Sequence, residues 1–239
     1  MADIKYKRIL LKLSGESFCR PGEFGLDIEA VEAVAAGIAR VCELGPQVAV
    51  VVGGGNFLRG QTFSAQNPIP RNTADYMGML ATVLNACALQ EMLERAHRPA
   101  RVMSAIEVPA LCEAFIQRRC VKHLESGRVV ILAGGTGNPF FSTDTCAALR
   151  AAELEADILI KATKVDGVYT DDPLKNPEAQ LMEKISYKDV LRRGLKVIDP
   201  AAISLCSENN VPIVVLNMFT PGSIEKAIRG EKVGTRIAR

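Results

Sequence analysis

Short apolar runs alternate with segments of helical periodicity along almost the whole chain. The apolar runs have the length of strands and are bounded by turn residues, which predicts strands buried on both faces. We expect these strands at 8–13, 47–52, 101–104, 128–133, 157–161 and 212–217. We expect helices at 27–44, 74–96, about 108–120, 143–155, 186–193, 199–209 and 222–229. Repeated strand–helix–strand order predicts an α/β fold with a mostly parallel central sheet and helices on both of its faces.

Local signals refine the boundaries of these elements. Asp27 precedes an apolar periodic run, and Ser186 to Asp189 has the form of a capping box at a helix start. Segment 162–185 is rich in turn residues and predicts a loop or a small hairpin over the carboxyl edge of the sheet. No linker, repeat or low-complexity tract interrupts the pattern, so we expect a single domain over residues 1–239.

Composition excludes several classes of function. The 239 residues are 48% hydrophobic and 23% charged, as in a globular protein with a substantial core. The formal net charge of +2 gives no bias toward nucleic acid or membrane, so any anion site has to be local. The seven cysteines form no CxxC pair, which favours reduced thiols in the core, and the two histidines lack metal-ligand spacing. The chain shows neither a signal peptide nor an apolar run near the roughly 20 residues that span a bilayer. We therefore expect a cytoplasmic protein without a metal site of its own.

Lys12 is the most informative polar residue of the predicted strands. It lies in the apolar run Arg8-Ile-Leu-Leu-Lys-Leu13, directly before Ser14-Gly15 turns the chain out of the sheet. An unpaired ammonium is costly to bury, so Lys12 is expected at the carboxyl end of the strand, where open α/β sheets bind ligands. It is either an anion ligand or a lysine that extends to water.

Three glycine-rich turns follow three of the predicted strands. They are Ser14-Gly15-Glu16, Gly53-Gly-Gly-Asn56 and Gly134-Gly-Thr-Gly-Asn-Pro139. Glycine allows backbone N–H groups to approach a phosphate closely, although each turn alone also has a purely structural interpretation. Three such turns at one sheet edge indicate an extended phosphate-rich ligand or two ligands that meet. Neither a Walker A motif nor the G-x-G-x-x-G fingerprint is present, so the predicted phosphate site is of another type.

Polar residues near these turns extend the candidate site. Arg59 lies four residues after Gly55 and offers a guanidinium to phosphate, unless it is simply an exposed arginine. Asp75 near the start of a predicted helix either complements the helix dipole or accepts from ribose hydroxyls. Core packing is the simpler interpretation of Phe140 and Phe141, with a helix cap from Ser142 or Thr143, and a pocket for a base is the alternative. Asp144 is positioned in sequence to orient Lys12.

Segment 161–173 mixes cations, carboxylates and one aromatic residue directly after a strand. As a solvated loop it would be unremarkable. As a nucleotide clamp it offers Tyr169 to an adenine and Lys164 to phosphates.

Taken together, these motifs resemble the bacterial uridylate kinases, a family within the amino acid kinase superfamily. The segments that carry the resemblance are 7–16, 53–60, 75–82, 135–141 and 161–168, and the similarity extends to 230–235. It implies a three-layer α/β/α sandwich, usually assembled as a homohexamer. It also implies ATP- and Mg²⁺-dependent phosphorylation of UMP to UDP, with GTP as activator and UTP as inhibitor. Segment 20–25 falls where GTP-responsive residues of the family lie.

The resemblance also implies a role for individual residues. Contacts to ATP are implied for Lys12, Leu13, Ser14, Gly15, Gly55, Arg59, Thr163, Tyr169 and Asp172. Contacts to UMP are implied for Gly54, Asp75, Thr136, Gly137, Asn138, Pro139, Phe140, Phe141, Ser142 and Thr143. Lys12, Asp144 and Lys164 are the expected catalytic residues.

Two other functions remain open at this point. The chain could be a nucleotide-binding regulatory module without turnover, although the combination of Lys12, Asp144 and Lys164 argues against this. It could also be a related kinase that acts on carbamate, aspartate or acetylglutamate. Segment 135–141 favours UMP, because kinases that form acyl phosphates need no pocket for a pyrimidine.

Overall fold

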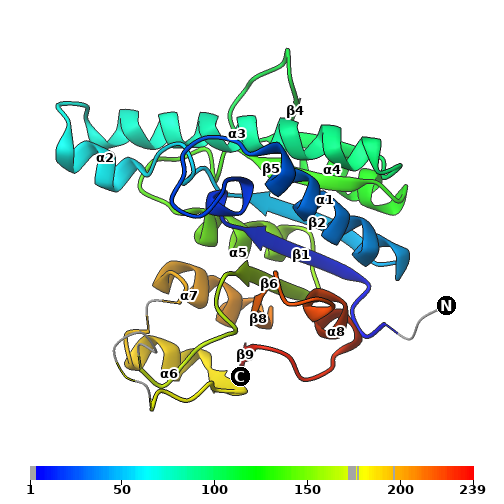
Figure 1. The fold of residues 1–239 in the computed structure, drawn as a ribbon, viewed down its shortest axis with the longest axis vertical. Helices are drawn as coiled ribbons and strands as arrows, with labels where there is room; N and C mark the ends of the chain where they lie inside the picture. The colour runs from blue at the N-terminus through cyan, green and yellow to red at the C-terminus, as the bar shows by residue number, and fades with distance from the viewer. Residues whose placement is uncertain (1–3, 172–175, 177, 196) are drawn as a thin grey trace.

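The computed structural model describes residues 4–171, 176, 178–195 and 197–239. Its strands are β1 (Arg8–Leu13), β2 (Gln47–Val52), β3 (Ala100–Ser104), β4 (Glu113–Ala114), β5 (Val129–Ala133), β6 (Ile158–Thr163), β7 (Lys184–Ser186), β8 (Ile213–Asn217) and β9 (Thr235–Ala238). Within the described residues they form one nine-stranded sheet in the order β4-β3-β5-β2-β1-β6-β8-β9-β7 (Figure 1). β8 and β9 pair antiparallel, and the other neighbours pair parallel. The predicted α/β fold with a mostly parallel sheet is confirmed.

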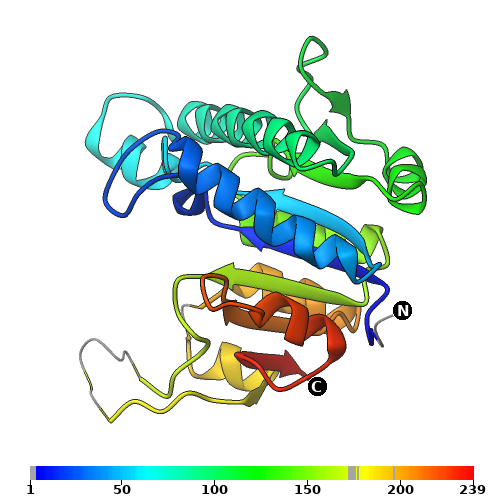
Figure 2. The same cartoon turned by 45° about the vertical axis from the view of Figure 1, so that its right-hand side comes forward.

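Helices cover both faces of this sheet. One hydrophobic cluster joins the sheet to α1 (Ile28–Glu43), α3 (Arg71–Arg95) and α8 (Ser223–Arg229). A second cluster joins the other face to α4 (Gln117–Glu125), α5 (Thr143–Glu153), α6 (Tyr187–Arg192) and α7 (Pro200–Glu208). Figure 2 shows α1 and α8 in front of the strands. Alternate β1 residues enter the two clusters, as the two-residue period of a strand requires.

The predicted helix signals act as expected at two starts. Asp27 Oδ1 accepts a hydrogen bond from Ala30 N at 2.9 Å and caps α1. Ser186 Oγ accepts one from Asp189 N at 3.0 Å and donates to the Asp189 carboxylate at 2.8 Å, which caps α6. The turn-rich segment after β6 contains a small hairpin, in which Thr170 N donates to Gln180 O at 2.9 Å. Among the described residues, no helix is both long and apolar enough to cross a bilayer.

The predicted helix over 108–120 is wrong. Residues 113–114 form β4, which pairs with the end of β3, and Phe115 N donates to Ser104 O at 2.9 Å. The helix α4 begins only at Gln117 and extends to Glu125, with Cys120 and Leu124 as its buried residues. The apolar spacing of 108–115 fits a helix, but pairing with an open sheet edge prevailed over that pattern. The short elements α2 (Gly60–Gln66), β7 and β9 were not predicted.

Candidate active site

A cavity of about 780 Å³ lies at the carboxyl ends of β1, β2 and β6, beside the first turns of α3 and α5. The parallel strand order explains why sequence-distant residues meet here, since parallel strands direct their carboxyl ends to one edge. The predicted site residues that line the cavity are Lys12, Ser14, Gly15, Gly54, Gly55, Arg59, Asp75, Phe140, Phe141, Ser142, Thr143, Asp144 and Thr163.

Among the residues that the structure describes, several other predicted site residues do not line this cavity. The Leu13 side chain is buried in the hydrophobic core, and its carbonyl accepts a hydrogen bond from Gly53 N at 2.9 Å. Residues 136–139 form a self-bonded turn, in which Thr136 Oγ1 accepts from Asn138 N at 3.2 Å. Lys164 is exposed, and Tyr169 forms a bridge with Leu181. Asp172 lies outside the described residues.

Two lysines share one carboxylate at the base of the cavity. Lys12 on β1 and Lys161 on β6 are register partners in adjacent parallel strands. Asp144, in the first turn of α5, contacts Lys12 Nζ through Oδ1 at 2.8 Å and Lys161 Nζ through Oδ2 at 2.6 Å. The predicted proximity of Asp144 to Lys12 is confirmed, and Lys161 is the additional cation that the sequence interpretation missed.

The three charges perturb one another through burial and proximity. Burial raises the pKa of Asp144, but the ammonium groups of Lys12 and Lys161 outweigh burial and hold this pKa below its ordinary value of 3.8. Burial lowers the pKa of Lys161 from 10.5, and the charge of Asp144 offsets only part of that effect. The cluster carries two cations and one anion when fully ionised, so it favours an additional negative charge in the cavity.

A signal for Lys161 was present in the sequence. Like Lys12, it is a lysine near the carboxyl end of an apolar strand, and Lys161 Nζ also donates to Val197 O at 2.5 Å. The polar loop around Lys164 predicts a phosphate contact for that lysine instead. The cost of burying an ammonium group distinguishes Lys161 from Lys164, because a lysine inside a buried strand needs a partner whereas an exposed lysine does not.

Close backbone packing accounts for several glycines of the turns. A Cβ on Gly15 would lie 2.3 Å from Gly55 N, and a Cβ on Gly53 would lie 2.7 Å from Gly15 N. The first two turns therefore pack directly against each other. The third turn is tied to α3, because Thr82 Oγ1 accepts a hydrogen bond from Gly134 N at 2.7 Å.

Asp75 is the centre of a second polar group in the cavity wall. Arg71 Nε donates to both Asp75 oxygens, at 2.8 and 2.9 Å, and Phe140 N donates to Asp75 Oδ2 at 2.8 Å. The Arg71 guanidinium lies 5.6 Å from the centre of the Phe140 ring. Arg71 thus belongs to the site although the sequence interpretation did not select it.

The two phenylalanines do not pack in the core. Phe140 is 68% exposed and Phe141 56% exposed, so the simpler interpretation of this segment is wrong for both rings. The predicted cap is confirmed, because Ser142 Oγ accepts from Asp144 N at 3.1 Å and from Thr145 N at 3.2 Å. The α5 start therefore holds Asp144 in place while the aromatic rings border open space.

Arg59 is paired within the site. Its guanidinium forms an ion pair with Glu16, the last residue of the first glycine turn. Arg59 is therefore held close to both of the first two turns, although its side chain remains largely exposed. An exposed, paired arginine of this kind can exchange its carboxylate partner for a phosphate.

Comparison with known proteins identifies the family. Residues 7–217 match the model of the amino acid kinase family. The chain belongs to this family. The fold and the resemblance expected from the sequence are thereby confirmed.

Solved structures of this family include close structural relatives. The UMP kinase from Bacillus anthracis is 37% identical, covers 98% of this chain and 96% of its own, and superposes with a TM-score of 0.94. The UMP kinase from Ureaplasma parvum is 35% identical over 99% of this chain and 100% of its own, with a TM-score of 0.91. The uridylate kinase from Archaeoglobus fulgidus is 32% identical over 96% of this chain and 99% of its own, with a TM-score of 0.74.

Proposed function

We propose that this kinase is a UMP kinase that reversibly transfers the γ-phosphoryl group of ATP to UMP, giving ADP and UDP in pyrimidine nucleotide biosynthesis. The observation that carries the proposal is the Lys12–Asp144–Lys161 cluster in a cavity bordered by glycine turns. The similarity to UMP kinases at 35–37% identity supports UMP as the acceptor.

The lysine cluster would stabilise the phosphoryl group during transfer. Bringing ATP to UMP opposes like charges, and two unit charges at 4 Å cost about 4 kcal/mol at an effective dielectric near 20. Lys12 and Lys161 would offset this repulsion, while Asp144 keeps both ammonium groups oriented. The nucleophile is a UMP phosphate oxygen that is already anionic at neutral pH. Catalysis therefore needs positioning and charge stabilisation rather than a general base.

The Asp75 group would hold UMP. A carboxylate has about four acceptor sites, so Asp75 keeps capacity for ribose hydroxyls beyond its bonds to Arg71 and Phe140. The exposed rings of Phe140 and Phe141 offer an apolar surface at the same wall. We assign the remaining UMP contacts to Gly54 and to residues 136–143.

ATP would occupy the part of the cavity near β6. Gly15, Gly55 and Arg59 are proposed phosphate contacts, and Thr163 lies at the end of β6 beside Lys161. Lys164, Tyr169 and Asp172 are retained as proposed ATP contacts, which requires the loop after β6 to approach the nucleotide. Lys161 takes the catalytic role that the sequence interpretation gave to Lys164.

Mg²⁺ is proposed to enter with ATP. Both oxygens of Asp144 contact lysines, so this carboxylate has little capacity to ligate a cation. Asp199 also lines the cavity, and its side chain makes no capping bond to its own helix α7. Its carboxylate is therefore the proposed ligand for Mg²⁺, which prefers oxygen ligands. When bound, Mg²⁺ would neutralise charge on the phosphates.

Regulation and assembly are proposed by similarity alone. They comprise activation by GTP, inhibition by UTP, a homohexamer and a cytoplasmic location. Light scattering coupled to size exclusion measures the assembly, and addition of each nucleotide to the kinase assay measures regulation.

A coupled ADP-release assay tests the function directly. ATP and Mg²⁺ are supplied with UMP, CMP or aspartate in parallel, and UDP is identified in the UMP reaction. We expect turnover with UMP and none with aspartate. Turnover with aspartate in place of UMP would assign the chain to the acyl-phosphate-forming kinases. Binding of both nucleotides without product would support the regulatory module instead.

A further inference from the structure

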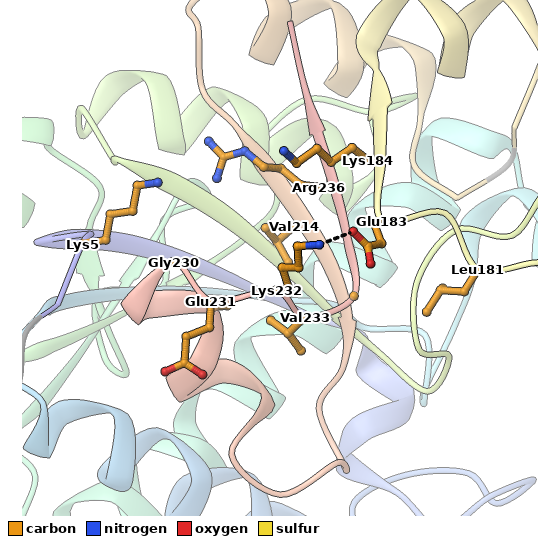
Figure 3. Close-up of a pocket in the computed structure, with 12 residues that line it drawn as sticks. Lys5, Leu181, Glu183, Lys184, Val214, Gly230, Glu231, Lys232, Val233 and Arg236 are labelled. Carbon is orange, nitrogen blue, oxygen red and sulfur yellow. Dashed lines mark hydrogen bonds and ion pairs between the residues drawn. The ribbon is translucent and has the colours of Figure 1, made fainter.

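A second cavity, of about 490 Å³, lies beside the end of α8 over the strands β8, β9 and β7 (Figure 3). Its walls come from Lys5 before β1, from Ala227 and residues 230–234, from Leu181 and Glu183 before β7, and from the three strands. It shares no lining residue with the candidate active site. The proposed phosphoryl transfer therefore leaves this cavity without a role.

Three cations of this cavity lack an acidic partner. Lys5, Lys184 and Arg236 form no ion pair with any residue in the described part of the chain. The two carboxylates of the cavity pair with other cations than these three. Glu183 pairs with Lys232 at 2.9 Å, and Glu231 lies 3.9 Å from Arg229. The uncompensated charge in this cavity is therefore positive.

Two of these cations are neighbours on the sheet. Lys184 on β7 and Arg236 on β9 are register partners in parallel strands. In the view of Figure 3 the Arg236 guanidinium lies between the Lys184 and Lys5 ammonium groups, and the Glu231 carboxylate is directed away from all three. Like charges directly opposite each other destabilise a sheet, so this pair is a cost to the empty protein. An anion bound between them would remove that cost.

Tyr6 contacts both Arg236 and Lys5 beside the cavity. Its buried hydroxyl accepts a hydrogen bond from Arg236 Nη1 at 2.5 Å, and Lys5 Nζ lies 5.5 Å from the centre of its ring. Lys5 N donates to Ile228 O at 3.0 Å, and a Cβ on Gly230 would lie 2.4 Å from Lys5 Cδ. The last turn of α8 thus accommodates the Lys5 stem closely. The helix dipole at the carboxyl end of α8 accounts for the position of the Lys5 charge, but not for those of Lys184 and Arg236.

We propose that this cavity binds a phosphorylated small molecule, with its phosphate held by Lys5, Lys184 and Arg236. Arginine and lysine donors suit phosphate oxygens. Leu181, Val214 and Val233 provide an apolar floor beside the cations, which fits an uncharged body attached to the phosphate. The volume is within the range of small-molecule sites. The site is distinct from the proposed substrate site, because the catalytic cavity is lined by other residues.

Inorganic pyrophosphate is the probe for this site. The Arg236 side-chain Nε–H signal is followed in a ¹⁵N-labelled full-length protein, and its assignment is checked by its loss in Arg236→Lys. We expect a saturable shift with pyrophosphate that sodium chloride at equal ionic strength does not reproduce. Lys5→Ala and Lys184→Ala should each weaken binding about tenfold or more. Lys226→Ala removes an exposed α8 cation outside the cavity. It should change the affinity for pyrophosphate by no more than about twofold.

The active-site variant Lys12→Ala separates the two cavities. It should leave the Arg236 shift intact, whether or not the proposed kinase activity is correct. The proposal is overturned if pyrophosphate produces no saturable shift, if Lys226→Ala weakens binding as much as Lys5→Ala, or if Lys12→Ala abolishes it.

A second measurement distinguishes a binding role from a structural one. Without ligand, Lys184→Gln should raise the Tm, because it removes repulsion from Arg236. A lower Tm would mean that Lys184 supports the fold, which would contradict the proposal.

Discussion

Asn56 and Asn85 exchange hydrogen bonds through their side-chain amides, at the junction of the second glycine turn and α3. Asn85 Nδ2 donates to Asn56 Oδ1 at 2.7 Å, and Asn56 Nδ2 donates to Asn85 Oδ1 at 2.9 Å. Asn85 also donates to Gly53 O at 2.7 Å, and Asn56 donates to Gly25 O at 2.8 Å. Both amides are buried. The network therefore fixes the turn that lines the cavity to both α3 and the segment before α1.

Breaking this amide pair should destabilise the protein strongly. Asn85→Leu leaves the Gly53 carbonyl and part of the Asn56 amide buried without partners. The free energy of unfolding, measured by urea denaturation, should therefore fall by about 1–3 kcal/mol. Asn56→Ala, Asn85→Ala and the double variant form a cycle whose coupling should exceed about 0.5 kcal/mol. The control is Asn209→Ala. The exposed amide of Asn209 donates to Leu205 O, a bond that water can replace, so stability should change by roughly 0.5 kcal/mol or less. Additive effects at 56 and 85 would contradict the network.

Lys161 and Lys164 should differ sharply in their effect on catalysis. Lys161→Met removes a cation that contacts Asp144, so kcat for UMP phosphorylation should fall about a hundredfold or more. Lys12→Ala should lower kcat similarly. Expressed as a free energy, this loss should be far larger than the loss in the free energy of unfolding. Lys164→Met removes an exposed charge that contributes at most to ATP binding, so its effect should appear mainly in the KM for ATP.

Steady-state kinetics with both substrates varied separates these effects. Circular dichroism and thermal unfolding establish that each variant is folded. A folded Lys161→Met enzyme with turnover near that of the wild type would exclude Lys161 from the transition state. A loss of kcat in Lys164→Met equal to that in Lys161→Met would return the catalytic role to Lys164.

The sequence predicts the sheet and one end of the site well because burial leaves a strong local pattern. The apolar run around Lys12 predicts the strand 8–13. The expected partner of Lys12, Asp144, lies 2.8 Å from its ammonium group. The local pattern of segment 108–120 predicts a helix, because the pairing of residues 113–114 with β3 is a long-range effect that leaves no local signal. The residues alone favour core packing for Phe140 over the pocket that the resemblance implies, because composition does not reveal exposure. Arg71 was missed because its bond to Asp75 looks in sequence like an ordinary helix pair.

Acid should weaken the protein through Asp144. Its pKa is held below 3.8 in the folded protein, so the native state binds fewer protons than the unfolded chain near this pH. The stabilisation is fully present above the unfolded pKa and is lost as the pH falls through the folded pKa. Asp144→Asn lacks this contribution, so its unfolding free energy should depend less on pH below about pH 4. Urea unfolding from pH 2 to 6 measures the difference, with the exposed Glu208→Gln as control.

Alkali should partly rescue the same variant. At neutral pH, Asp144→Asn leaves two buried ammonium groups without their carboxylate and should cost about 3 kcal/mol. Without Asp144 the pKa of Lys161 falls further, so the native state releases a proton before the unfolded chain does. The stability of Asp144→Asn should therefore rise as the pH increases toward 10.5, more steeply than that of the wild type. Equal slopes for the two proteins at alkaline pH would contradict the shared-carboxylate arrangement.

Gly60 should control the position of Asp75. A Cβ on Gly60 would lie 2.1 Å from Asp75 Oδ1 and 3.0 Å from Asp75 N, so Gly60→Ala must displace the carboxylate or separate α2 from α3. Because Asp75 is the proposed acceptor for UMP, the KM for UMP should rise about tenfold or more while the KM for ATP changes little.

Gly37→Ala is the matched control for this substitution. Gly37 lies inside α1, where the nearest atom to an added Cβ is Arg40 Nη2 at 3.8 Å, an ordinary contact. Alanine there should stabilise the helix by up to about 1 kcal/mol without changing either KM. If Gly60→Ala raised both KM values equally, the substitution would be acting on the whole cavity rather than on Asp75. An unchanged KM for UMP in a folded Gly60→Ala enzyme would remove Asp75 from the proposed UMP site.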